Sequence, residues 1–97
     1  MIKVQNSYEC QLPYDTKEVK QLELVFNNTF IILFEVEEPQ KKIVYHISSN
    51  GKIIRKCFVC SDIRNIVIAA DDLVLIPLLE KSEIVSINLR SGKTTRN

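Results

Sequence analysis

Several residue types are scarce in this chain, and each absence removes a class of function. The 97 residues include two glycines, three cysteines and no tryptophan. Both glycines fall in turn-like pairs, Asn50-Gly51 and Ser91-Gly92, which leaves no glycine-rich loop to cradle a phosphate. An odd number of cysteines fits reduced thiols better than a disulfide framework. We therefore expect a cytoplasmic protein.

Net charge and long apolar runs are missing as well. Thirteen basic and twelve acidic residues give a formal charge of +1, which provides no general attraction to nucleic acid or to anionic lipid. The longest apolar stretches, 30–34 and 73–79, have the length of a strand and not of a membrane span. Residues 1–6 lack the apolar core of a secretion signal. We expect one domain, 1–97, that binds neither nucleic acid nor membrane.

The residues that most often carry chemistry do not form a recognisable set. Cys57 and Cys60 have the spacing of a metal or redox pair, but strand residues three apart point to opposite faces and do not easily share one ion. His46 is the single histidine, and its neighbours include no recognisable nucleophile or orienting carboxylate. We expect no cofactor and no metal. A small enzyme that uses His46 is the third alternative for function.

Short apolar runs predict an all-β fold. They are rich in Ile, Val, Phe, Leu and Tyr and are interrupted by Asn, Asp, Gly, Ser and Pro. We expect strands at approximately 2–5, 8–12, 19–26, 30–36, 43–48, 52–59, 63–69, 73–79, 84–89 and 93–97. Short connections favour an antiparallel meander. Pro77 cannot donate a ladder hydrogen bond, so we expect its strand to end near Ile76 or to contain a bulge there.

The chain also repeats itself at a spacing of roughly 41 to 44 residues, which suits a four-stranded propeller blade. The aligned segments are 19–28 with 63–72, 30–34 with 73–76, and 44–52 with 84–93. This repeat predicts two four-stranded, blade-like antiparallel sheets, built from residues 19–59 and 63–97 after an N-terminal strand segment at 1–12. Such a pair of sheets is half a β-propeller. A β-sandwich or a barrel is the alternative, because strand alternation is similar in all three.

The segment Val44-Tyr45-His46-Ile47, followed by Asn50-Gly51-Lys52, resembles the third strand, turn and fourth strand of quinoprotein-type propeller blades, and so does 84–93. Two blades do not close a ring, so a half-propeller has open sheet edges that allow a homodimer. In outline it is similar to some immunity proteins of bacterial contact-dependent growth inhibition systems. That similarity implies a non-enzymatic protein that binds and neutralises a cognate toxin. The alternative is a structural or self-assembling blade module that completes a larger ring.

The blade layout sorts the connections onto two sides of the chain. The tight turns at 27–28, 50–51, 71–72 and 91–92 are expected on one side, the turn side. The longer connections at 15–18, 37–42, 61–62 and 80–83 are expected on the other, the connection side. The connection side carries seven acidic residues, Asp15, Glu18, Glu37, Glu38, Asp62, Glu80 and Glu83, and four basic residues, Lys17, Lys41, Lys42 and Lys81.

We predict that these seven acidic residues, with Tyr14 as an aromatic anchor, bind a basic protein partner such as a nuclease toxin domain. Opposite potentials would speed association and select the partner. The other interpretation is that charged loop residues on this side are simply solvated.

Overall fold

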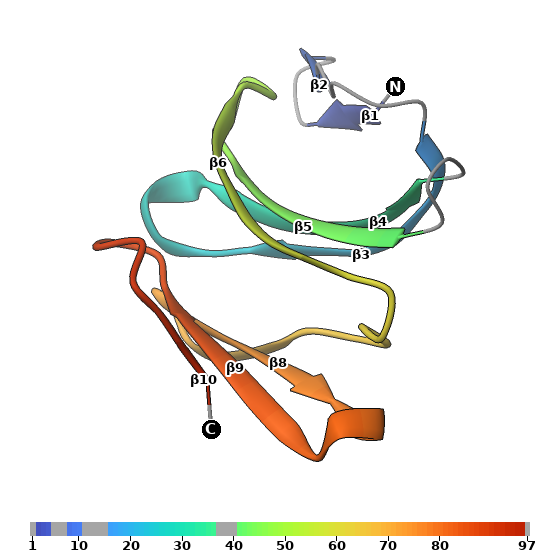
Figure 1. The fold of residues 1–97 in the computed structure, drawn as a ribbon. Helices are drawn as coiled ribbons and strands as arrows, with labels where there is room; N and C mark the ends of the chain where they lie inside the picture. The colour runs from blue at the N-terminus through green and yellow to red at the C-terminus, as the bar shows by residue number, and fades with distance from the viewer. Residues whose placement is uncertain (1, 5–7, 11–15, 37–40, 97) are drawn as a thin grey trace.

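The computed structural model describes residues 2–4, 8–10, 16–36 and 41–96 of the chain (Figure 1). Its strands are β1 (Ile2–Val4), β2 (Tyr8–Cys10), β3 (Thr16–Leu24), β4 (Phe30–Val36), β5 (Lys41–Ile47), β6 (Ile53–Cys60), β7 (Val67–Ala70), β8 (Leu73–Leu78), β9 (Glu83–Asn88) and β10 (Thr94–Arg96). Single 3-10 turns occur at Phe26–Asn28 and Leu79–Lys81, and the described residues contain no α-helix. The all-β prediction is confirmed.

The strands form two four-stranded sheets and one hairpin. The first sheet has the order β3-β4-β5-β6, and the second sheet has the order β7-β8-β9-β10. Every pair of neighbours is antiparallel, so each sheet is a meander in chain order. β1 and β2 pair with each other as an N-terminal hairpin. The expected pair of four-stranded sheets is therefore confirmed, and they do not close into a barrel.

Pro77 does not interrupt its strand. β8 continues to Leu78 in unbroken register with β9, and Pro77 lies opposite Ile84. The expectation of a strand end near Ile76, or of a bulge, is therefore wrong. The reason lies on the other side of β8, where pairing with β7 ends at Leu75. Because β7 supplies no paired residue opposite Pro77, the missing amide hydrogen removes no bond from that ladder.

The registers of the two sheets show which residues are equivalent. Corresponding triples of cross-strand neighbours are Leu24, Phe30 and Ile47 in the first sheet, and Ile68, Val74 and Ile87 in the second. The sequence repeat already aligns Leu24 with Ile68 and Ile47 with Ile87. Their shared neighbours, Phe30 and Val74, are therefore equivalent as well. The expected alignment of residue 30 with residue 73 is therefore wrong by one position. Leu73 takes the place of the polar Thr29 and extends the apolar run by one residue.

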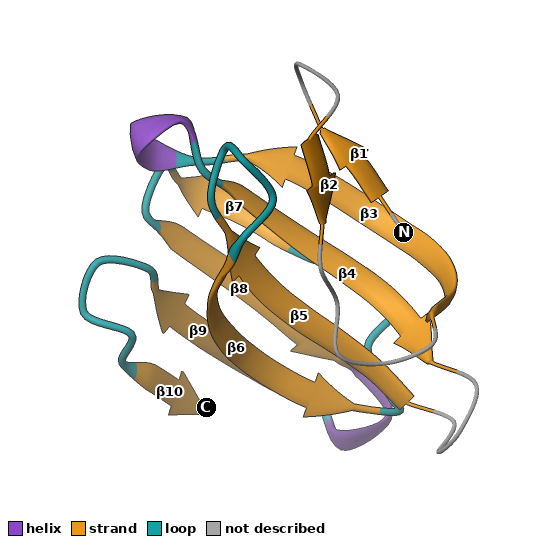
Figure 2. Cartoon of the chain, turned by 90° about the horizontal axis from the view of Figure 1, so that it is seen from above, coloured by secondary structure: helices purple, strands orange, loops and turns teal. Residues whose placement is uncertain are grey.

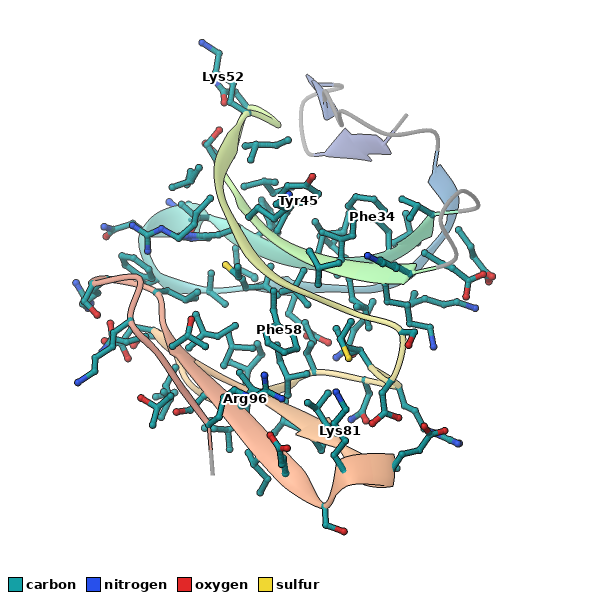
Figure 3. All side chains as sticks on the ribbon, viewed as in Figure 1. Phe34, Tyr45, Lys52, Phe58, Lys81 and Arg96 are labelled. Carbon is teal, nitrogen blue, oxygen red and sulfur yellow. The ribbon has the colours of Figure 1, made fainter. Side chains whose placement is uncertain are left out.

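These equivalences define two corresponding faces on each sheet. The front face carries Ile32, Phe34 and Tyr45 in the first sheet, and Ile76, Leu78 and Val85 in the second. The back face carries Ile31, Leu33 and Val44 in the first sheet, and Leu75, Pro77 and Ile84 in the second. The back face of the first sheet packs in one buried cluster with the front face of the second. The sheets are therefore stacked front to back, and Phe58 lies between them (Figure 3).

The front face of the first sheet is buried too. Ile32 and Phe34 are fully buried in a second cluster, in which the rings of Phe34 and Tyr45 stack with centroids 5.2 Å apart. β1 and β2 lie on this side of the first sheet, away from the second sheet (Figures 1 and 2). The molecule thus has three layers: the hairpin, the first sheet and the second sheet.

A backbone hydrogen bond and a cation–π contact at the turn side join the two sheets. The backbone N–H of Phe26 donates to the carbonyl of Asp71 at 2.8 Å. The Arg90 guanidinium donates to the Asp72 carboxylate at 2.9 Å and lies 4.6 Å from the centroid of the Phe26 ring. Asn27 holds the turn of the first sheet in the left-handed region, with φ of 55°, which asparagine tolerates better than most residues. The turns at 27–28, 71–72 and 89–92 therefore lie together.

Candidate protein-docking surface

None of the described strands or turns covers the back face of the second sheet, and we call it the open face. Its members are cross-strand neighbours on paired strands and are Val67, Ala70, Leu73, Leu75, Pro77, Ile84, Ser86, Asn88 and Thr95. Six of these nine are apolar, three are polar without a charge and none is charged. Val67 is 43% exposed and Ile84 is 49% exposed. In Figure 1 this surface faces away from the first sheet.

The strand at the centre of this surface has the sequence of a strand covered on both faces. β8 is apolar at every position, Leu-Val-Leu-Ile-Pro-Leu, and so is the Phe-Ile-Ile-Leu-Phe run that opens β4. Continuous apolar strands are typical of sheets buried on both sides, whereas a half-solvated strand alternates. β4 fulfils that pattern, because both of its faces are buried. In β8 only Val74, Ile76 and Leu78 are fully buried.

A polar pocket of about 370 Å³ lies on the connection side. Its walls come from β3, β5, the segment that leads from β6 to β7, and the 3-10 turn after β8. The lining residues are Lys20, Lys42, Ser61, Asp62, Arg64 and Glu80. Three cationic and two anionic side chains give this pocket a slight positive balance. One carboxylate oxygen of Asp62, Oδ2, is buried and has no hydrogen-bond partner among the described residues.

The structure brings only part of the predicted acidic site together. Asp62 and Glu80 line the same pocket, beside Lys20, Lys42 and Arg64. Tyr14, Asp15, Glu37 and Glu38 lie outside the described residues.

The other two predicted acidic residues form ion pairs. Glu18 accepts a hydrogen bond from Lys20 at 2.9 Å, and this bond raises the pKa of Lys20. Glu83 lies 2.9 Å from a guanidinium nitrogen of Arg96. Basic neighbours therefore partly neutralise the acidic excess that the loop sequences suggest.

His46 is buried between the sheets at 3% exposure. The Thr29 hydroxyl donates to the Phe26 carbonyl, so at 2.8 Å it accepts a bond from His46 Nε2–H. Nδ1 is then the unprotonated nitrogen, and it has no partner among the described residues. Burial, and after it the charge of Arg55, lowers the pKa of this imidazole. His46 is therefore held neutral in the core between the sheets.

Cys57 and Cys60 both pack against the core between the sheets, so the expectation that they face opposite sides is wrong. The register explains the error. Val44 pairs with Phe58 and Tyr45 pairs with Lys56, which leaves Cys57 as the extra residue of a bulge. Burial raises the pKa of the Cys57 thiol to about 11, so it stays protonated and unreactive at neutral pH. The described residues contain no group of three or more potential metal ligands.

The open face was not predicted from the sequence, because the candidate residues were charged side chains, a tyrosine, a histidine and cysteines. The signal was present in two places, the unbroken apolar run of β8 and Ile84 at a position where β9 is otherwise polar. Neither signal shows which face is covered, since that depends on how the sheets stack.

Comparison of the chain with protein-family models, with curated proteins and with solved structures finds no match. Within the described part of the chain, no helix is long and apolar enough to cross a membrane.

Proposed function

We propose that this chain is a non-enzymatic protein-binding module that docks its partner on the open face. The observation that carries the proposal is an uncharged sheet face with Val67 and Ile84 exposed, next to a strand whose sequence is that of a buried one. Contiguous exposed apolar surface on a folded domain marks interaction sites more often than single exposed side chains do.

Neutralisation of a bacterial toxin is the specific form of this proposal that the sequence favours. The front-to-back stacking of two equivalent sheets supports the resemblance to propeller blades on which that form depends. Docking through Glu18, Asp62, Glu80 and Glu83 has less support, because ion pairs occupy two of them and cations surround the others.

A structural role within a larger assembly is the second candidate. The apolar character of β8 favours it, because a strand of this kind fits between two other layers. In that role the open face would be permanently covered.

Co-expression with the product of the adjacent gene tests the toxin-neutralising form. We expect the unaltered chain to restore growth when that product is toxic. Ile84→Lys places a charge on the open face and should abolish the rescue. Ile54→Lys is the matched control, because Ile54 is the same residue type, is 48% exposed and lies on β6 of the first sheet. Equal rescue by both variants would remove the open face from the binding site.

A further inference from the structure

We infer that the open face binds the apolar front face of another four-stranded antiparallel sheet, stacked front to back and supplied by a different protein chain. This inference rests on the proposed function and specifies its partner. The molecule already contains one interface of this type, between the back face of the first sheet and the front face of the second.

Equivalent positions of the two back faces have closely related chemistry. Ile31 and Val44 of the first sheet, both fully buried, correspond to Leu75 and Ile84 of the second. The replacements are therefore aliphatic for aliphatic.

Two polar positions of the first sheet's back face carry less polar residues in the second. Glu23 is replaced by Val67, and the buried His46 is replaced by Ser86. The open face is thus at least as suited to a covering sheet as the back face that is already covered.

A second copy of the chain does not offer the required surface. The front face of its first sheet lies under β1 and β2, and the front face of its second sheet is packed on the first. Both front faces are occupied within each copy, so a second copy of the described residues does not supply the covering sheet.

A tandem extension of the full chain tests the inference with a known sheet as the probe. A second copy of residues 61–96 is joined after Arg96, in place of Asn97. Residues 61–66, which connect β6 to the second sheet, then also connect β10 to the appended sheet. The appended sheet then presents a complete front face, including Ile76, Leu78 and Val85, to the open face. Its core amides should become protected from hydrogen exchange, and the denaturant m-value should rise by roughly a third, with the surface added.

Two variants of the original unit complete this experiment. Ile84→Lys should leave the appended amides exchanging like those of an unfolded chain, whereas Ile54→Lys should leave them protected. Circular dichroism of each variant without the extension verifies that the parent folds. An appended sheet that stays unprotected, or that is protected equally in both variants, would overturn the inference.

The mass of the unextended chain in solution separates this inference from its competitor. We expect a monomer by light scattering at micromolar concentration. A dimer that Ile84→Lys dissociates would show that a second copy covers the open face, and would overturn the choice of partner. The appended sheet could stack on the open face while Ile84→Lys leaves the rescue of growth unchanged. That result would overturn the proposed function but not the preference of the open face for a sheet.

Discussion

The two sheets repeat the same strand order and the same cross-strand pairs, yet they differ in how they are covered. The first sheet is buried on both faces, by the N-terminal hairpin and by the second sheet. Among the described residues, the second sheet is fully buried on its front face alone. β8 nevertheless has the continuous apolar sequence that is typical of a strand buried on both faces. The sequence of a strand thus indicates how many layers it can pack between, and for β8 the described residues provide only one of the two.

Two successive leucines at the end of β8 and the start of the following 3-10 turn should differ most in their contribution to stability. Leu78 is fully buried between the sheets, so Leu78→Ala should lower the free energy of unfolding by about 2–5 kcal/mol through lost burial and a cavity. Leu79 is the next residue but is 59% exposed, so Leu79→Ala should change it by about 0.5 kcal/mol or less. Urea denaturation measures both, and similar losses would contradict the burial difference.

His46 makes the first sheet sensitive to pH at a position where the second sheet has Ser86. Its pKa is lowered in the folded state from an ordinary value of 6.5, so below pH 6.5 the unfolded chain binds more protons than the folded chain. The free energy of unfolding should therefore be fully retained above pH 6.5 and should decrease as the pH falls through the folded pKa. Urea denaturation of the chain and of His46→Gln between pH 7 and 5 checks this. An unchanged slope in the variant would show that other groups cause it.

Arg90 joins the turns of the two sheets, and its removal should have a smaller effect. Arg90→Ala loses an exposed ion pair with Asp72 and a cation–π contact with Phe26, together worth about 1 kcal/mol. Part of the loss should vanish in high salt, which screens the ion pair. Arg64→Ala is the control, because Arg64 is exposed and forms no ion pair with another described residue. Denaturant midpoints at low and high salt separate the two contributions.

The sequence predicted the strands well because each strand carries its own local pattern. Residues 30–36 are strongly β-forming, and Gly51 and Gly92 mark turns with positive φ, so both are identifiable without tertiary information. Three details depended on neighbours in space. The register at Leu73 follows from the pairing of β8 with β9. The tolerance of Pro77 follows from the start of β7 at Val67, and the orientation of Cys57 follows from the bulge in β6.

The candidate site was less predictable than the fold. Loop charges suggested an acidic surface, but Lys20 and Arg96 reach Glu18 and Glu83 only in the folded chain. The sequence does not show which strand face is left open, for a related reason. β4 and β8 have the same apolar character, and only the stacking order leaves one of them uncovered.

The most direct measurement places the same charge on equivalent positions of the two back faces. Val44 is fully buried under the second sheet, whereas its equivalent Ile84 is half exposed on the open face. Val44→Lys should cost at least about 3 kcal/mol of unfolding free energy, because it buries an unpaired charge. Ile84→Lys should change that free energy by about 0.5 kcal/mol or less. Equal costs at the two positions would contradict the account, since both back faces would then be covered, or neither.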